Sequence, residues 1–467
     1  MRILDDHSTT FPVVVPIAII GGGACGMAAA LSACDAGIEA LILERDSIPA
    51  GSTALSSGMI PACRSRQQQI NGIDDSVDIM AADILNKSKN QTNAELVRTV
   101  CSASGPLIDW LSDTHAIELT LVDGFLYPGH SRLRMHAPPS RSGADLISGL
   151  TRAAEQADIT LFTDALVTHL YVNQQKAVSG LQVQRPDGSV ELIGCETVVL
   201  ACNGFGGNAD MVKQYIPQMV EANYFGHAGN QGDAIMWGQE LGAATEHLGA
   251  YQGHGSVAHP HGILISWALM MEGGIQINSR GERFSNEHGG YSEQARHVLE
   301  QPGGYAWNIF DRRLYDIVKN FEDFRQAENN GAIKVAASIA QLSEITATPL
   351  SVLQDTLAQV EDMTVGETID EYGRDFTTKP RLKPPYYTTK VTGSLFHTQG
   401  GLVVNKEARV LNQQGEIFPN VFAGGGAACG VSGPEDWGYL SGNGLLTALT
   451  LGRIAGANAA KLVQKGR

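Results

Sequence analysis

Positive charge is scarce in this sequence, which has 33 lysines and arginines against 49 aspartates and glutamates and a net charge of −16. A surface of that sign repels phosphate backbones and anionic lipids, so the balance argues against nucleic-acid binding and membrane-surface roles. The chain, at 467 residues, is long enough for two domains with large buried cores.

Closely spaced cysteines are also lacking. The seven cysteines are scattered along the chain without a Cys-x-x-Cys pair. This pattern fits neither a disulfide framework nor a zinc site. We therefore expect reduced thiols, a cytoplasmic protein and no bound metal.

Long hydrophobic runs without helix breakers are missing too. The segment Phe11–Cys34 contains no charged residue, but Pro12, Pro16 and Gly21–Gly23 interrupt it. Acidic residues such as Asp5 stand ahead of this segment, where a signal peptide carries positive charge. We expect neither a membrane span nor a signal or lipid anchor.

Glycine is abundant, with 53 residues, and its first cluster carries a nucleotide-binding signature. The stretch "VVVPIAIIGGGACGMAAALSACDAGIEALILER" predicts a strand, a glycine turn, a helix and a second strand. Gly21 makes the turn, Gly23 lets the backbone reach a pyrophosphate, and Gly26 lets the helix pack on the strand. Glu44, at the end of the second strand, can accept the ribose hydroxyls, which favours a ribose without a 2′-phosphate.

Two further strands run into glycine turns, in "TVVLACNGFGGN" (197–208) and near the C-terminus in "NVFAGGGAACG" (420–430). Between them, "GNQGDAIMWGQELGAA" (229–244) predicts a turn with an acid that opens a helix. Glycine-rich strand ends spread over the whole chain imply one nucleotide domain built from both ends of the sequence.

The segment from 255 to about 388 has a different sequence pattern, with amphipathic stretches such as "LSVLQDTLAQVEDM" and polar turns. We expect a discontinuous nucleotide-binding domain over 1–253 and 398–467, and an inserted capping domain over 254–397.

The ordered motifs resemble those of one flavoprotein family, which includes soluble fumarate reductases, succinate dehydrogenase flavoprotein subunits and ketosteroid dehydrogenases. Besides the opening glycine motif and 229–244, the resemblance rests on "GSTALSSGMIPA" (51–62), "AHPH" (258–261), "GGIQINSRGERFSNE" (273–287), "FHTQGGLVVN" (396–405) and "SGNGLLTALTLGRIAG" (441–456). It implies an α/β fold with a Rossmann-like FAD domain of the glutathione-reductase type and an inserted α+β cap. It also implies a reaction at a carbon–carbon bond beside a carbonyl or carboxylate.

The cofactor implied by this resemblance is FAD. Respiratory members attach it covalently through a histidine beside the 51–62 block, and no histidine occurs in that block here, so we expect noncovalent FAD. The predicted FAD-binding residues are Gly21, Gly23, Gly26, Glu44, Ser52, Thr53, Ser57, Gly58, Asn203, Gly204, Asp233, Gly426, Gly442, Asn443 and Leu445.

Two histidines match family positions that hold the substrate's carboxylate or carbonyl group, His259 in "AHPH" and His397 in "FHTQGG". A single histidine is more often a surface or satisfied core residue, so motif context carries this prediction. The neighbouring His254, His261 and His288 have no support beyond proximity.

The cationic residues of the fumarate reductase site are missing. Tyr291 replaces the catalytic arginine after the "RF-x-NE" block, and Tyr439, in "WGYLSGNG", replaces the arginine that clamps a second carboxylate. The stretch "ISWALMMEGGIQIN" is short and lacks the family's relay arginine, and Glu272 matches the relay glutamate in only some alignments. Without these charges, a buried dicarboxylate would keep its desolvation penalty, so we expect a ligand with a neutral oxygen.

Tyr291, which the sequence places at a helix start after a strand and a polar turn, is the predicted replacement acid/base. A phenol can donate to a ketone or, as phenolate, take a proton from the adjacent carbon, as the ketosteroid dehydrogenases do. Its ordinary pKa of about 10 would then have to be lowered by its surroundings. An aromatic residue packed under the cap is the structural alternative.

Two weaker candidates complete the site predictions. The loop "GHSRLRMHAPPSRSG" is interpreted as a solvated basic loop, although a grip on a substrate acid group stays open. Ser266 is a candidate pocket residue. The basic side chains of that loop are Arg132, Arg134, His136 and Arg141.

Together these features predict an FAD enzyme that dehydrogenates or reduces the α,β bond of a ketone or carboxylic acid, with hydride transfer at flavin N5. Tyr291 would handle the α-proton, while His259, His397 and Tyr439 would hold the activating oxygen. The alternatives are a reductase of an unsaturated acid of the fumarate or urocanate type and, from another class, a flavin-binding sensor or assembly protein without turnover. The expected partners are a small-molecule substrate and a diffusible electron donor or acceptor.

Overall fold

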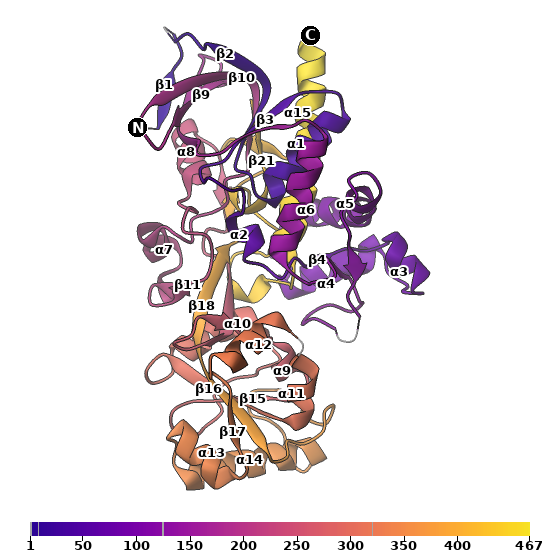
Figure 1. Cartoon of the computed structure of the whole chain (residues 1–467), viewed down its shortest axis with the longest axis vertical. Helices are drawn as coiled ribbons and strands as arrows, with labels where there is room; N and C mark the ends of the chain where they lie inside the picture. The colour runs from indigo at the N-terminus through magenta and orange to yellow at the C-terminus, as the bar shows by residue number, and fades with distance from the viewer. Residues whose placement is uncertain (1, 8, 124–125, 320) are drawn as a thin grey trace. The chain divides into compact units, whose positions relative to one another are not determined.

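The computed structural model describes residues 2–7, 9–123, 126–319 and 321–467 (Figure 1). The chain forms two compact units. The first unit comprises Met1–Ile216, Gly226–Tyr251 and His397–Arg467, and the second comprises Pro217–Phe225 and Gln252–Phe396. Relative to the predicted boundaries, the second unit also takes in 217–225 and the two residues before position 254, while His397 belongs to the first.

A mixed sheet forms the centre of the first unit. Its parallel part joins β10, β2, β3 and β7, and β21 pairs in parallel with the other side of β10. The antiparallel pairs β8–β9 and β9–β10 extend it, and β1 adds to β8 in parallel. The strands are β1 (Ile3–Asp5), β2 (Val13–Ile20), β3 (Ala40–Leu43), β7 (Thr160–Phe162), β8 (Leu166–Val172), β9 (Val178–Gln184), β10 (Val190–Leu200), β20 (Arg409–Leu411) and β21 (Ile417–Ala423).

Helices and small strands surround this sheet. The helices of the first unit are α1 (Ala24–Asp35), α2 (Gly51–Ala54), α3 (Arg66–Ile70), α4 (Val77–Lys87), α5 (Ala94–Asp113), α6 (Gly143–Gln156), α7 (Ala209–Tyr215), α8 (Asp233–Leu241) and α15 (Asn443–Gly466). The short strands β4 (Ile60–Pro61), β5 (Thr120–Leu121) and β6 (Met135–Ala137) form one small sheet, and β12 (Thr245–Glu246) and β19 (Gly401–Leu402) form another.

Helices α1 and α15 pack side by side although they lie at opposite ends of the sequence (Figure 1). Small residues make this approach possible: a Cβ at Gly452 would lie 2.3 Å from the Cys25 carbonyl oxygen, and one at Gly456 would lie 2.0 Å from that of Ala29. This contact explains how both ends of the chain build one domain, because the glycine-rich strand ends of β2 and β21 are brought to the same edge of the sheet.

The second unit is α+β. Its sheet has the order β14-β13-β18-β16-β15, and β11 and β17 also pair with β18. The strands are β11 (Asn223–Tyr224), β13 (Tyr251–Ala258), β14 (Ile263–Leu264), β15 (Ile275–Ile277), β16 (Tyr305–Asp311), β17 (Lys334–Ala336) and β18 (Tyr386–Thr398). The helices are α9 (Ala268–Met271), α10 (Tyr291–Leu299), α11 (Arg312–Val318), α12 (Glu322–Asn329), α13 (Ile339–Thr346) and α14 (Leu350–Val365).

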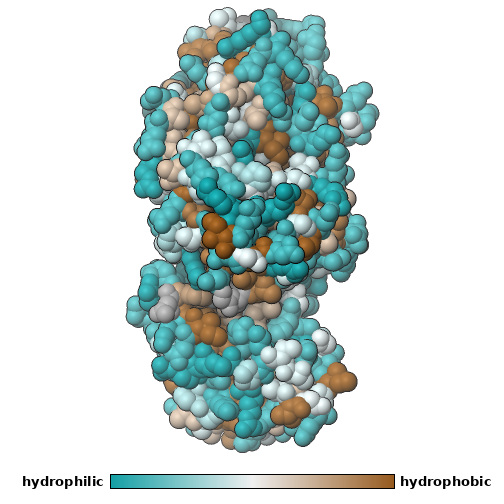
Figure 2. Space-filling view, turned by 90° about the vertical axis from the view of Figure 1, so that its right-hand side faces the viewer, coloured by the Kyte–Doolittle hydropathy of each residue, from teal (hydrophilic) through white to brown (hydrophobic). Residues whose placement is uncertain are grey.

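On the face drawn in Figure 2, hydrophilic side chains predominate and hydrophobic ones occur in small groups, in keeping with the net charge of −16. Among the described residues, no helix combines the length and the apolar composition that a membrane crossing requires.

Candidate active site

The turn between β2 and α1 has the geometry that the glycine motif predicts. Gly21 has a φ of +109°, and a Cβ there would lie 2.5 Å from the Ala201 carbonyl oxygen. A Cβ at Gly26 would lie 1.9 Å from the Gly21 carbonyl oxygen, whereas one at Gly23 would meet only the Thr53 hydroxyl, at 3.6 Å. The protein itself therefore requires Gly21 and Gly26, while Gly23 keeps open the space in front of the α1 N-terminus, where a pyrophosphate fits.

Glu44 anchors this turn from the end of β3. Its Oε2 accepts a hydrogen bond from the Gly22 N–H at 2.7 Å, and its Oε1 accepts one from the Asp46 N–H at 3.0 Å. A carboxylate has about four lone-pair sites, so acceptor capacity remains for ribose hydroxyls. Thr53 accepts from the Ala24 N–H at 3.1 Å.

The other glycine-rich strand ends meet close by within the first unit. The Asn203 side-chain oxygen accepts from the Gly204 N–H at 2.8 Å, and a Cβ at Gly426 would lie 2.1 Å from that oxygen. Ser52 accepts from the Asn230 side-chain amide at 2.8 Å. The ends of β10 and β21 thus lie in contact.

The remaining predicted FAD residues fall on these same loops and helix starts. Asp233 begins α8, and its carboxylate binds the Arg2 guanidinium at 2.6 Å. Gly58 has a φ of +65° against the Ser142 carbonyl. Ser57 and Leu445 are both half-buried.

The turn before α15 offers buried polar atoms to a ligand. Gly442, with a φ of +83°, is the N-cap of α15 and supplies no side-chain cap. In the described part of the chain, the Ser441 hydroxyl and the Asn443 side-chain oxygen are buried without a hydrogen-bond partner. Buried polar atoms almost always have partners, so these residues fit a bound polar group such as FAD.

His397 and Tyr439 lie together beside this turn. Their ring centroids are 5.6 Å apart and nearly perpendicular, and a Cβ at Gly444 would lie 2.8 Å from the imidazole. His397 Nδ1 is 2.8 Å from the Gln399 side-chain nitrogen, which can only donate, and 3.4 Å from the Thr398 carbonyl oxygen, which can only accept. The shorter contact favours a proton on Nε2. Burial lowers the pKa of His397 to about 4, so the ring is neutral at physiological pH and presents an N–H donor.

Tyr291 and His254 form the corresponding pair in the second unit. Tyr291 is the first residue of α10, as predicted, and its ring stacks on His254 with centroids 4.9 Å apart and planes at 22°. The Ser256 N–H donates to His254 Nδ1 at 3.1 Å, which again leaves the proton on Nε2. Burial lowers the pKa of His254 to about 3, and Phe396 stacks on this histidine at 5.5 Å.

His259 has a different setting from His254, although both belong to the β13 region. It is exposed just beyond the end of β13, where its N–H donates to the Lys390 carbonyl oxygen at 2.8 Å. The histidine that contacts Tyr291 is His254, which sequence reasoning left unsupported. The sequence signal for this role was the glycine on either side of His254, which allows a strand to pack tightly. A Cβ at Gly255 would lie 2.7 Å from Gln294, so the strand that carries the ring is closely packed.

Two buried cationic side chains of the second unit are bound to carboxylates. Arg283 contacts Glu287 and Asp370 at 2.7 and 2.6 Å, and Arg374 contacts Glu287 at 2.9 Å, all four side chains being buried. Each of these guanidinium groups is therefore held in a buried ion pair with a carboxylate of the same unit.

Two other predicted residues are also engaged within the second unit. The Glu272 carboxylate, at the end of α9, binds the Lys379 ammonium at 2.8 Å. The half-buried Ser266 accepts from the Ala268 N–H at 3.3 Å.

The interpretation of 129–143 as a solvated basic loop is wrong for two of its side chains. Arg134 and His136 are buried, with exposures of 1% and 0%. A guanidinium can be buried because Asp75 and Asp83 pair with it, and both of these acids lie more than 50 positions earlier in the chain. Arg132 is half-buried and donates to the Asp74 carbonyl oxygen.

Comparison with known proteins identifies the family. The family model described as "FAD binding domain" matches residues 17–445. The chain belongs to this FAD-binding family. The probable fumarate reductase Ifc3 of Shewanella frigidimarina is 29% identical over 448 residues, which are 95% of this chain and 74% of that protein. The urocanate reductase of Eggerthella lenta is 28% identical over 461 residues, with 96% and 75% covered.

Solved structures show the same fold. The open conformation of a flavocytochrome c3 fumarate reductase matches with a TM-score of 0.81 and 28% identity, over 97% of this chain and 79% of that one. A 3-ketosteroid-Δ4-(5α)-dehydrogenase from Rhodococcus jostii RHA1 matches with a TM-score of 0.80 over 98% and 100%, and at 23% identity it supports the fold alone. The predicted family, the α/β fold class and the FAD cofactor are confirmed, and the protein is an FAD-dependent oxidoreductase.

Proposed function

We propose that the protein adds or removes hydrogen across the α,β bond of a ketone or carboxylic acid, and that its substrate presents a neutral oxygen to the site. The observation that carries this proposal is a buried neutral imidazole in each unit, His254 in the second and His397 in the first, each with a hydrogen bond to Nδ1 and an Nε2–H that can donate. Fixed neutral donors stabilise the enolate oxygen that forms when the α-proton is removed.

Each residue has a distinct role in this proposal. FAD, when bound, supplies the two-electron chemistry. Tyr291 moves the proton at the α-carbon, and His254, stacked on its ring, holds it in place and donates to the activating oxygen. In the first unit, His397 and Tyr439 are proposed to donate hydrogen bonds to a substrate oxygen. His254 thus takes the role that the motif assigned to His259.

A substrate panel tests this function. Anaerobic mixing of the oxidised enzyme with cyclic ketones and saturated acids is expected to bleach the flavin absorbance with at least one ketone, since the proposed site residues are neutral donors and the buried Arg283 and Arg374 are paired with carboxylates. Brisk bleaching by succinate alone, or rapid turnover of fumarate by reduced enzyme, would contradict the neutral-oxygen proposal.

A second candidate is reduction of an unsaturated acid. It is favoured by the similarity over nearly the whole chain to a probable fumarate reductase and a urocanate reductase. The same panel run in the reductive direction, with reduced enzyme and unsaturated acids, distinguishes the two candidates.

We further propose that FAD is held without a covalent bond. The block at 51–62 contains no histidine, and its Ser52 and Thr53 side chains are engaged with Asn230 and Ala24. Acid or heat denaturation is therefore expected to release yellow flavin into the supernatant. Flavin that stays with the precipitated chain would show covalent attachment instead.

The electron partner is proposed to be a diffusible donor or acceptor, and the location is proposed to be the cytoplasm. The second of these rests on the cysteines, which are free in the described residues and include buried thiols such as Cys25 and Cys195. Free thiols are typical of a reducing compartment.

A further inference from the structure

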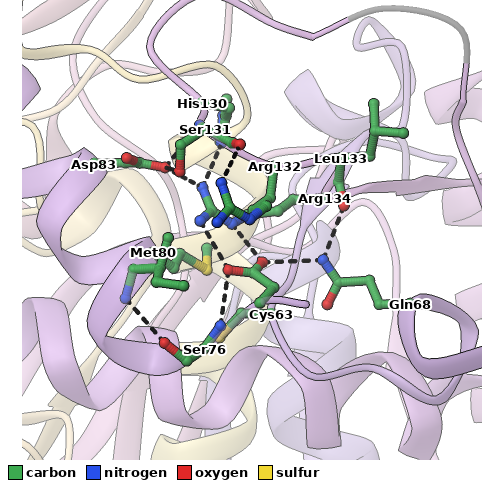
Figure 3. Close-up of polar contacts among 12 residues, drawn as sticks. Cys63, Gln68, Ser76, Met80, Asp83, His130, Ser131, Arg132, Leu133 and Arg134 are labelled. Atoms are coloured by element: carbon green, nitrogen blue, oxygen red, sulfur yellow. Dashed lines mark hydrogen bonds and ion pairs between the residues drawn. The ribbon is translucent and has the colours of Figure 1, made fainter. Parts of the chain in front are cut away.

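A buried charged cluster in the first unit is linked through His130 to the turn that precedes α15. Arg134 donates from Nε to Asp75 Oδ2 at 2.7 Å and from Nη2 to Asp75 Oδ1 at 2.9 Å, and its Nη1 contacts Asp83 (Figure 3). Gln68 also donates to Asp75, at 3.0 Å. A bidentate ion pair with its carboxylate held on several sides fixes the guanidinium in one position.

His130 connects this fixed guanidinium to the C-terminal turn. Arg134 Nη1 is 3.4 Å from His130 Nδ1, and His130 Nε2 is 2.9 Å from the Ser441 carbonyl oxygen, 311 positions away in the sequence. Both contacts agree with one tautomer, because a guanidinium can only donate and a carbonyl can only accept. Nδ1 then accepts from Arg134, and Nε2–H donates to Ser441.

The residue held by His130 lies in the candidate site itself. Ser441 stands between Tyr439 and the N-cap of α15, Gly442, and the next residues pack against the His397 ring. In the part of the chain that the structure describes, the hydroxyl of Ser441 and the side-chain oxygen of Asn443 are buried and have no hydrogen-bond partner. His130 therefore fixes the backbone of this turn. The Asn443 side-chain nitrogen donates to Ser432 at 3.2 Å, whereas the Ser441 hydroxyl and the Asn443 side-chain oxygen are left for a ligand.

We propose that His130 is a positioning residue for FAD. It acts through the Ser441 carbonyl and sets the turn that presents Ser441, Asn443 and the first turn of α15 to the cofactor. The inference rests on FAD binding, which the family establishes, and it goes beyond the proposed reaction because it concerns the cofactor alone.

Comparison of His130→Leu with His130→Gln tests the role. Leucine removes the donor to Ser441, so FAD binding is expected to weaken and its Kd to rise about tenfold, the contribution of one buried hydrogen bond. The flavin absorption spectrum is also expected to shift. Glutamine carries an N–H at the position of Nε2, so its Kd is expected to stay within about threefold of wild type. Kd is measured by FAD titration of stripped protein, and the spectrum is measured on the holoenzyme.

His136→Leu is the matched control. His136 is buried on the same segment, and its ring contacts Ser65 and the Arg134 carbonyl at 2.8 Å each, and neither partner lies in the C-terminal turn. Both leucine variants should lower the melting temperature, whereas only His130→Leu should change FAD affinity and the flavin spectrum.

Equal FAD affinity and identical flavin spectra in the two leucine variants would overturn the proposal and leave His130 a purely structural residue. If His130→Leu does not fold, His130→Asn serves in its place, because the shorter amide cannot reach Ser441. Failure of the reaction proposed above would leave this result untouched, since neither measurement uses a substrate.

Discussion

Replacement of Tyr291 by phenylalanine is expected to lower turnover by about 10²–10⁴, the usual contribution of a positioned proton donor or acceptor. The substitution removes only the hydroxyl and keeps the ring that stacks on His254. FAD content and the melting temperature should therefore stay close to wild type. The measurements are kcat and kcat/KM with the ketone identified by flavin bleaching.

Tyr439→Phe is the control for this prediction. Tyr439 packs edge-on against His397 and is proposed to polarise the substrate oxygen, so its loss should also slow the reaction, through weaker stabilisation of the enolate. Exchange of the α-proton in deuterated water without net turnover separates the two roles. It should vanish in Tyr291→Phe and persist, slowed, in Tyr439→Phe.

Unchanged α-proton exchange in Tyr291→Phe would remove this tyrosine from the mechanism. His254 would then be the next candidate for the proton transfer, because it lies against the same ring. His254→Phe would test that assignment, since it retains an aromatic ring for the stack and lacks the Nε2–H.

Two substitutions in the first glycine turn are expected to have large effects on different properties, the first on FAD affinity and the second on the stability of the fold. In Gly23→Ala, the new Cβ meets only Thr53 at 3.6 Å, so the folded protein tolerates it, but the methyl group occupies the space proposed for the pyrophosphate. We expect FAD affinity to fall by roughly 100-fold or more, about 3 kcal/mol, while the FAD-free protein melts as wild type does.

In Gly26→Ala, the clash is with the protein itself. The Cβ would lie 1.9 Å from the Gly21 carbonyl oxygen, so α1 has to move away from β2, at a cost of about 3 kcal/mol or more in the free energy of unfolding. Melting curves of FAD-free and FAD-saturated protein distinguish the two variants. Normal FAD binding by Gly23→Ala would refute the assignment of this turn to the pyrophosphate.

The predictions that the sequence carried best concern local structure. The strand, turn and helix around Gly21 follow from β-branched residues, glycines and small residues within about 20 positions, and the starts of α10 at Tyr291 and of α15 at Asn443 are of the same kind. Such features depend on backbone preferences and hydrogen bonds between near neighbours, so a short segment contains the information that they need.

Which polar side chains are buried was decided by tertiary structure alone. Arg134 looks like an exposed basic residue until Asp75 and Asp83 pair with it, and the hydrogen bond from His130 to Ser441 spans most of the chain. Of the histidines in and before "AHPH" (258–261), packing buries His254 against Tyr291 and leaves His259 exposed, although His259 is the one within the motif. Burial and electrostatic pairing depend on segments that meet only after folding, because the cost of burying a polar group is set by whichever partners the fold delivers.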